Sequence, residues 1–243
     1  MSRFFVEGSF SVGDRVALAG GDAHRLAGVL RAVPGDSVEI LDGRSRRFDG
    51  RVREVGRERV TVELVAELPP ARREAALAIT LAQGVPKGQK MDFVVEKTVE
   101  LGAARIVPLL SERAVARAEG AQKIERWRRL AKAAALQCGR ELVPEVTEPL
   151  SFGEALALGR EHDAMLMPWE LAEARPLRER IVEIGDARRI LVLIGPEGGF
   201  SQREAHEAAA AGALLISLGP RILRTETAAI VLMAALLALR GEL

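Results

Sequence analysis

The residues with the clearest chemical potential lie in two glycine-rich segments near the end of the chain, Leu193–Ser201 and Leu218–Thr227. Each segment follows an apolar, strand-like stretch, contains Gly and Pro, and then opens a helix. A strand end, a glycine-rich loop and a helix N-terminus together form a common small-molecule site in α/β proteins. Because the segments begin about 25 residues apart, we expect them to form adjacent loops that close on one ligand.

The first segment reads LIGPEGGFS and contains Gly195, Gly198 and Gly199. Glycine allows backbone angles and a close ligand approach that side chains would prevent. Ser201 and Glu204 fit a capping box, which predicts a helix starting at Gln202. The segment has neither the Gly-Lys-Ser/Thr of a P-loop nor the spaced glycines of the dinucleotide fingerprint. Taken alone, such a loop is more often an ordinary strand-to-helix turn than a ligand site.

The second segment ends in Arg224-Thr225-Glu226-Thr227, which places one cation, one carboxylate and two hydroxyls at the start of an apolar helix. Either threonine fits a helix N-cap, and Glu226 fits the positive end of the helix dipole. Capping does not account for Arg224, because a cation is unfavourable at that end of a helix. We therefore interpret Arg224 as facing a ligand or substrate.

Together the two segments resemble the cofactor-binding knot of the SPOUT methyltransferase superfamily. Within it, the chain resembles the RsmE family, which methylates N3 of a uridine in small-subunit ribosomal RNA. The similarity covers nearly the whole chain and continues in Arg3 to Phe5, His24, Val29 to Arg31, Lys90 to Phe93, Glu100 to Gly102, Ser111 to Arg113, Gln137 to Arg140, Pro144 and Glu145. The chain departs from the family at Leu136, where a Glu is common.

The patterns of the two halves of the chain predict two domains. Residues 1–70 contain short strand-like runs at 15–18, 37–41, 48–55 and 59–65, with one helical stretch, Asp22–Arg31, and are typical of a small barrel. After Pro69-Pro70, strand and helix patterns alternate, which predicts an α/β domain with a mainly parallel sheet over 75–243. Its expected strands are Leu77–Ala82, Ile106–Leu110, Asp163–Met167, Ile190–Ile194 and Ala213–Leu218. The resemblance implies that the first domain is a PUA-like barrel that binds RNA and that the second contains a deep trefoil knot.

Composition limits the compartment and the assembly. A net charge of +1 does not indicate nucleic-acid binding, and a single cysteine fits a reducing cytoplasm. The run Ala228–Leu239 has 12 apolar residues, too few to span a bilayer. Because this helix is apolar on nearly all sides, we expect a homodimer to bury it. On this interpretation, a charge at Leu232 or Leu236 would give monomers or aggregates.

The resemblance implies S-adenosylmethionine as cofactor, no metal ion, and 16S rRNA as the substrate, within the small ribosomal subunit. The implied cofactor-binding residues are Leu193, Ile194, Gly195, Pro196, Glu197, Gly198, Gly199, Leu218, Gly219, Ile222, Leu223, Thr225 and Thr227. A side chain at Gly198, as in Gly198→Val, is expected to fill the pocket. Arg224 is the first choice to pair with a uracil oxygen that gains charge, while Glu197 or Glu226 either accepts the N3 proton or holds a helix end or the cofactor.

Basic side chains are the candidates for phosphate contacts. They are Arg3, Arg31, Arg44, Arg46, Arg47 and Arg51 in the barrel, and Lys87, Lys90, Arg113 and Arg140 beyond it. Between Arg113 and Arg140, eight basic residues stand against Glu119 and Glu125, so this stretch either follows phosphates or forms a solvated helix face. Two other functions stay open: a methyltransferase of another RNA atom or of tRNA, and a non-catalytic RNA-binding factor in ribosome assembly.

Overall fold

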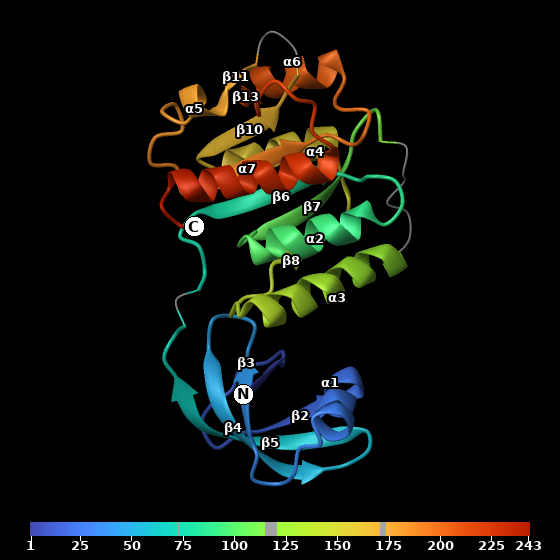
Figure 1. Ribbon diagram of the computed structural model, residues 1–243, viewed down its shortest axis with the longest axis vertical. Coiled ribbons are helices and arrows are strands. Elements are labelled where there is room, and N and C mark those ends of the chain that lie inside the picture. Colours follow the sequence, from blue (N-terminus) through green and yellow to red (C-terminus); the bar gives the residue numbers. More distant parts are fainter. Residues whose placement is uncertain (72, 115–120, 171–173) are drawn as a thin grey trace. The chain divides into compact units, whose positions relative to one another are not determined.

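The computed structural model describes residues 1–71, 73–114, 121–170 and 174–243, and the chain divides into two compact units (Figure 1). The first unit comprises Met1–Glu74 together with Ala135–Val143. The second comprises Ala75–Ala134 and Pro144–Leu243. The segment 135–143 thus packs with the first unit although it lies far from that unit in the sequence.

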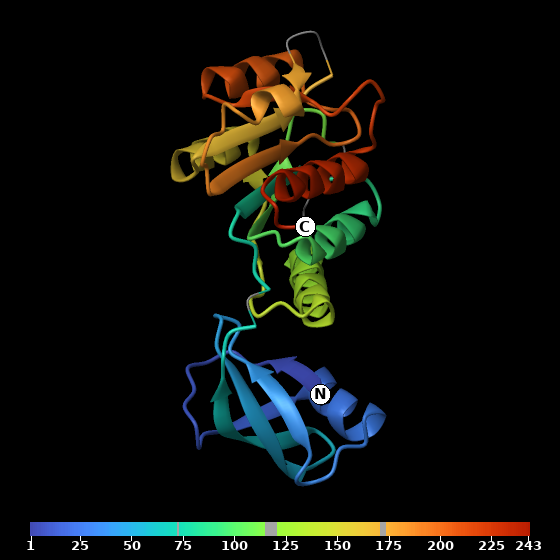
Figure 2. The same ribbon diagram turned by 60° about the vertical axis from the view of Figure 1, so that its left-hand side comes forward.

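The first unit is built on a five-stranded sheet that curls into a half-barrel (Figure 2). Its strands are β1 (Ser2–Phe5), β2 (Arg15–Ala19), β3 (Ser37–Leu41), β4 (Arg47–Val55) and β5 (Arg59–Leu68), in the order β1-β3-β4-β5-β2. β1 runs parallel to β3, and the other pairs are antiparallel. Alternate residues such as Phe4, Phe48 and Leu64 point into a common apolar core. The four predicted barrel strands are confirmed, and β1 adds a fifth.

The helical stretch predicted at 22–31 exists but changes character along its length. It consists of α1 (Gly20–His24) followed by a π-helix, η1 (Arg25–Val29). Arg31 then takes a left-handed φ of 53°, which ends the helix two residues earlier than predicted.

The second unit contains an eight-stranded parallel sheet, as predicted. Its strands are β6 (Ala78–Gly84), β7 (Arg105–Leu110), β8 (Glu145–Val146), β9 (Leu150–Ser151), β10 (Ala164–Pro168), β11 (Arg175–Pro176), β12 (Arg189–Ile194) and β13 (Leu214–Ser217). The order is β11-β13-β10-β12-β6-β7-β8, with β9 also paired to β7. The five predicted strands are confirmed to within two residues, whereas the two-residue strands β8, β9 and β11 were not expected. The trefoil knot stays a prediction.

Helices connect these strands. They are α2 (Lys90–Glu100), α3 (Ala121–Cys138), α4 (Phe152–Ala157), the 3₁₀ turn η2 (Leu158–Glu161), α5 (Leu177–Arg180), α6 (Gln202–Ala210) and α7 (Thr225–Leu239). Ser201 and Glu204 form the predicted capping box, so α6 starts at Gln202 as expected. None of the helices in the described part of the chain combines the length and the apolar character that a membrane span requires.

The last helix is apolar but not buried on every side. Leu232 and Leu236 are fully buried inside the protomer, whereas Val231 and Leu239 are 38% and 52% exposed. A charge at either of the two leucines would therefore disrupt the core of the protomer itself. The expectation that such a change would report on a dimer was wrong for this reason.

The residues after α7 return to the beginning of the same unit. Glu242 accepts hydrogen bonds from the backbone N–H of Ala76 (2.7 Å) and of Leu77 (3.1 Å), immediately before β6. The C-terminal segment thus holds the entry to the central strand.

Asp163, at the start of β10, couples stability to pH. The Arg189 guanidinium and the backbone N–H groups of Arg189 and Arg188 hold the pKa of Asp163 far below its usual range. A depressed carboxyl pKa stabilises the fold above the unfolded-state value of about 4, and this contribution is lost as pH falls below it.

We therefore expect Asp163→Asn to lower the melting temperature at pH 7, and the gap from wild type to narrow as pH falls from 4 to 2.5. Thermal unfolding followed by circular dichroism across this range measures the effect. A gap that stays constant would contradict it.

Candidate functional site

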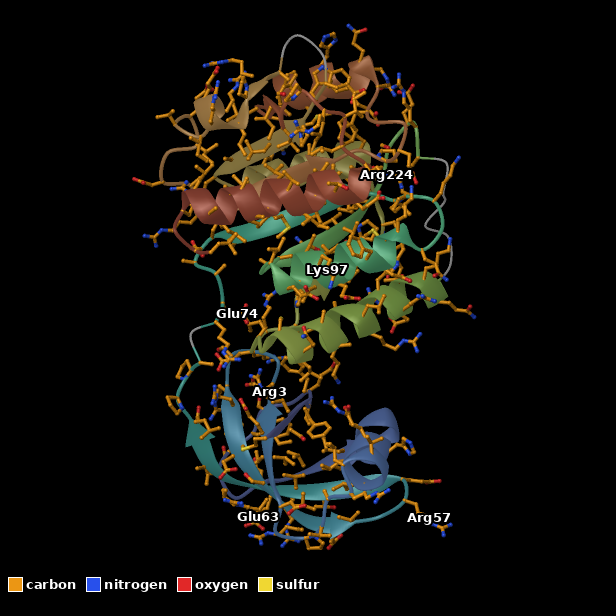
Figure 3. The ribbon with its side chains drawn as sticks, viewed as in Figure 1. Arg3, Arg57, Glu63, Glu74, Lys97 and Arg224 are labelled. Carbon is orange, nitrogen blue, oxygen red and sulfur yellow. The ribbon has the colours of Figure 1, made fainter. Side chains whose placement is uncertain are left out.

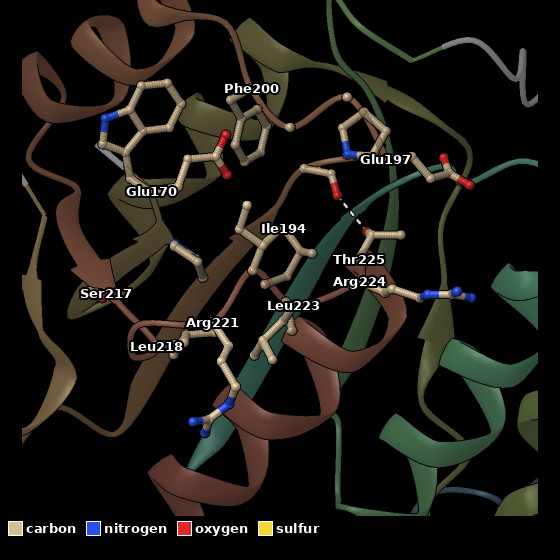
Figure 4. Close-up of a pocket in the computed structure, with 18 of the residues that line it drawn as sticks. Glu170, Ile194, Glu197, Phe200, Ser217, Leu218, Arg221, Leu223, Arg224 and Thr225 are labelled. Carbon is tan, nitrogen blue, oxygen red and sulfur yellow. Dashed lines mark hydrogen bonds between the residues drawn. The ribbon is translucent and has the colours of Figure 1, made fainter. Parts of the chain in front are cut away.

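The carboxyl ends of β10, β12 and β13 and the start of α7 surround a pocket of approximately 670 Å³ (Figure 4). The first glycine-rich segment contributes Ile194, Gly195, Pro196, Glu197, Gly198, Gly199 and Phe200, and the second contributes Leu218, Gly219, Pro220, Arg221, Ile222, Leu223, Arg224 and Thr225. The structure thus brings the two segments together around one cavity, as the sequence predicted. Two predicted residues do not line it: Leu193 lies in the apolar core, and Thr227 lies further along α7.

Two glycines of the first loop are required by its backbone. Gly199 has a left-handed φ of +64°, and its open side faces the Glu170 carboxylate, with 3.6 Å between a Cβ placed there and Oε1. A Cβ on Gly195 would lie 3.0 Å from the carbonyl carbon of Gly199. Side chains at these positions would strain the loop or enter the cavity.

Gly198 has a different neighbour from the one expected. A Cβ at this position would lie 3.2 Å from Cβ of Arg113, which follows β7. Gly198→Val would therefore press first on the Arg113 loop, while Gly198 itself lines the pocket, so its effect on cofactor binding stays a prediction.

A glycine outside both segments, at the end of β6, contacts the first loop through its backbone. Gly84 ends β6, and a Cβ there would lie 2.5 Å from the backbone nitrogen of Pro196 and 2.8 Å from the carbonyl carbon of Gly195. The loop therefore rests directly on the backbone of β6, a strand more than 100 residues earlier.

The start of α7 differs from the capping prediction. Arg224 occupies the N-cap position without a side-chain cap, so neither Thr225 nor Thr227 is the N-cap. Instead, the Thr225 hydroxyl donates to the Gly195 carbonyl oxygen at 2.5 Å, which joins the two loops (Figure 4).

Two cations at the pocket stay available for a ligand. The side chains of Arg224 and Arg221 are exposed, and neither has a hydrogen bond or ion pair with any residue that the structure describes. Arg224 extends outward from the start of α7 (Figures 3 and 4). This position agrees with the interpretation of Arg224 as a residue that faces a ligand.

The two predicted carboxylates have different environments. Glu197 accepts hydrogen bonds from Lys90 Nζ (2.8 Å) and from the backbone N–H of Lys87 (3.0 Å). Burial alone would raise the pKa of Glu197, but these hydrogen bonds hold it below its ordinary value. Glu197 is therefore ionised, with its lone pairs engaged, and is a weak proton acceptor. Glu226 does not line the pocket, and its buried Oε2 has no hydrogen-bond partner in the described ranges.

Several predicted RNA-binding arginines of the first unit pair with carboxylates. Arg3 and Arg47 both contact Glu39, Arg47 also contacts Glu141, Arg140 contacts Glu74, Arg46 contacts Glu67 and Arg51 contacts Asp49. The contacts of Arg47 with Glu141 and of Arg140 with Glu74 attach the segment 135–143 to the barrel and its linker. Arg31 and Arg44 are exposed, without an ion pair to a described carboxylate.

The basic stretch 113–140 is also largely paired where the structure describes it. Arg126 contacts Asp92, and Arg128 contacts both Glu125 and Glu148. Arg113 donates to the Gly198 carbonyl oxygen at 3.1 Å. Arg117 and Glu119 lie outside the described residues. The helix α3 therefore has the ion pairs of a solvated face.

The sequence interpretation missed one wall of the pocket. Trp169 and Glu170 follow β10 directly and line the cavity, together with Pro168, Ser217, Ala228 and Lys90. The strands β10 and β12 are parallel, and the carboxyl ends of parallel strands lie at the same edge of a sheet. The position of Trp169-Glu170 directly after a predicted strand could therefore have indicated that these residues line the site.

Comparison with known proteins agrees with this geometry. The profile of the RNA methyltransferase domain matches residues 73–237. A ribosomal RNA small subunit methyltransferase E from Synechocystis is 34% identical over 92% of this chain and 73% of its own length. The Neisseria gonorrhoeae ribosomal RNA small subunit methyltransferase E, crystallised with S-adenosylmethionine, is 34% identical, with a TM-score of 0.86 over 98% of both chains.

A second solved structure gives the same result. A Legionella pneumophila protein described as a methyltransferase, in complex with S-adenosylmethionine, is 32% identical, with a TM-score of 0.88 over 98% of this chain and 97% of its own. The similarity spans both units and the pocket between the glycine-rich segments and α7. The chain therefore belongs to the ribosomal RNA small subunit methyltransferase E family.

Proposed function

We propose that this protein transfers a methyl group from S-adenosylmethionine to N3 of a uridine in the 16S rRNA of the small ribosomal subunit. The observation that carries the proposal is a glycine-walled pocket beside Arg224, which has no ion-pair partner among the described residues, in a chain of this family. With this substrate, the reaction would take place in the cytoplasm.

The pocket fits the cofactor in size and chemistry. A volume of approximately 670 Å³ lies in the usual range for small-molecule sites. Ile194 and Leu223 supply apolar walls, and the bare backbone of Gly195 and Gly199 allows close approach. Glu170 has no ion-pair partner within the described ranges and would accept hydrogen bonds from hydroxyl or ammonium groups of the ligand. When bound, the cofactor supplies a methyl group on a positively charged sulfur.

Arg224 would stabilise the uracil as it loses its N3 proton. The negative charge that develops spreads onto the neighbouring carbonyl oxygens, and a guanidinium beside them lowers the barrier. Neither predicted carboxylate is assigned as the proton acceptor: Glu197 lines the pocket but is engaged by Lys90 and Lys87, and Glu226 does not line it.

RNA phosphates would be held by the cations that have no carboxylate partner in the described parts. They include Arg31 and Arg44 in the first unit and Lys87 and Arg221 in the second. Arg31 follows the exposed side chains of Val29 and Leu30, which add an apolar contact surface for bases. Arg3, Arg46, Arg47 and Arg140 would act mainly by holding the first unit together.

A homodimer would cover the exposed side of α7. Thr227, Val231, Ala234 and Ala238 form one stripe along this helix, and Phe93 on the adjacent α2 is 47% exposed. An apolar stripe of this kind is typical of a surface that meets a partner. The proposed partner is a second copy of the chain.

We expect Val231→Lys to convert this dimer into a monomer, because the new ammonium would be desolvated at the interface. Light scattering coupled to size exclusion measures the molecular mass. Val182→Lys, at a valine that is 78% exposed elsewhere in the same unit, is the matched control and leaves the mass unchanged. A wild-type monomer, or a Val231→Lys dimer of unchanged affinity, would exclude this interface.

The test of the proposed function is methyl transfer from labelled S-adenosylmethionine to small ribosomal subunits that lack their native uridine methylation. Mass spectrometry of the digested RNA then identifies the nucleoside, and we expect 3-methyluridine. Cofactor binding without transfer would indicate a different RNA substrate, such as tRNA. Neither binding nor transfer would favour a non-catalytic assembly factor.

A further inference from the structure

A buried glutamine lies next to the Thr225–Gly195 hydrogen bond that joins the two pocket loops. Gln83 is the penultimate residue of β6 and is fully buried. Burying an amide costs free energy unless it is hydrogen-bonded. Its Nε2 donates to Thr225 Oγ1 at 2.8 Å and to the Gly84 carbonyl oxygen at 2.9 Å, whereas its buried Oε1 has no partner among the described residues. The side chain thus connects the central strand to the first residue of α7.

The direction of this hydrogen-bond chain is fixed by its far end. The Gly195 carbonyl can only accept, so the single hydroxyl proton of Thr225 is committed to it. Thr225 must then accept from Gln83, which requires the amide nitrogen to face it. The chain runs from Gln83 through Thr225 to Gly195, and it joins β6, α7 and the loop after β12. Linked donors of this kind polarise and strengthen one another.

Gln83 itself does not line the pocket, whereas Thr225, Gly195 and the adjacent Arg224 do. Its influence on a ligand must therefore pass through Thr225. Arg224 is the N-cap of α7 and directly precedes Thr225, so any shift of Thr225 moves the guanidinium relative to the loop that would hold the cofactor.

We propose that Gln83 is a positioning residue, which sets the placement of Arg224 over the target base by holding Thr225 against Gly195. This inference rests on the proposed function and deepens it. Displacements of about 1 Å in a reacting group are enough to cost about 100-fold in rate. A partial release of the helix start should cost less, about tenfold.

The variant Gln83→Leu replaces the amide by an apolar side chain of similar size. We expect kcat to fall about tenfold, with the calorimetric Kd for S-adenosylmethionine within about threefold of wild type. Thr225→Val, which removes the hydroxyl, should cost at least as much. Because both substitutions break the same chain of hydrogen bonds, the double variant should lose no more turnover than Thr225→Val alone. Thr225→Ser keeps the hydroxyl and should restore most of the turnover.

Thr80→Val is the matched control for lost stability. Thr80 lies on the same strand, is nearly as buried, and its hydroxyl contacts His162 Nε2 at 2.8 Å, away from the pocket. Hydrogen exchange measured by mass spectrometry should rise over 195–201 and 222–230 in Gln83→Leu but not in Thr80→Val. This measurement does not depend on methyl transfer. A wild type without methyltransferase activity would therefore contradict the proposed function but leave the role of Gln83 testable. Three results would overturn the role of Gln83. They are unchanged hydrogen exchange in Gln83→Leu, a loss of kcat in the double variant equal to the product of the two single losses, and a loss of kcat in Thr80→Val as large as in Gln83→Leu.

Discussion

Replacing Arg224 by alanine is expected to lower the turnover of methyl transfer by about 100-fold to 1,000-fold, the usual effect of removing one group that stabilises developing charge. Arg224 lies at the N-cap of α7, exposed, without a described partner, so its loss leaves no buried charge behind. The melting temperature and the calorimetric Kd for S-adenosylmethionine should therefore change little. Single-turnover kinetics on small ribosomal subunits measures the effect.

Two neighbouring variants sharpen this prediction. Arg224→Lys keeps the charge but loses the planar pair of donors, so it should recover only part of the rate. Arg221→Ala removes an exposed arginine from the same pocket and should weaken RNA binding more than it lowers turnover. Wild-type turnover in Arg224→Ala would remove this residue from the mechanism.

Gly84→Ala is expected to weaken cofactor binding by more than tenfold. The new Cβ would lie within 2.8 Å of three atoms of Gly195 and Pro196, two of them backbone, so the loop itself must move. Gly84 does not have a positive φ, so the change introduces no backbone strain of its own. Isothermal titration with S-adenosylmethionine measures the loss.

Gly153→Ala is the control for this experiment. Gly153 is in α4, and a Cβ there meets nothing within 4 Å. Alanine favours a helix over glycine by roughly 1 kcal/mol, so this variant should be as stable as wild type or slightly more so, with unchanged affinity. Equal cofactor affinity in Gly84→Ala and Gly153→Ala would show that the loop does not depend on its contact with β6.

The parts of the site that the sequence predicted are those with local signals. Gly199 indicates a loop, and the Ser201–Glu204 capping box indicates a helix start a few residues later. Arg224 was recognised because a cation is anomalous at a helix N-terminus. Such signals depend only on the backbone and the immediate neighbours in the chain.

The parts that the sequence did not predict depend on strand order. Gly84 and Gln83 matter only because β6 pairs with β12, and neither periodicity nor composition specifies that pairing. The distinction between Leu232, which is buried, and Val231, which is exposed, depends in the same way on what packs against each side of α7. The ion pairs of Arg140 and Arg47 required residues 135–143 to join the first unit, which no local pattern indicates.

The pairing of β6 with β12 and the return of Glu242 to Ala76 also have a consequence for synthesis. β6 leaves the ribosome more than 100 residues before β12, its neighbour on one side, and α7, which supplies a wall of the pocket, follows later still. Until β12 has been synthesised, the nascent chain exposes an unpaired, apolar edge of β6, to which chaperones can bind. A chain released before α7 is synthesised therefore lacks one wall of the pocket, which Thr225 and Ala228 supply.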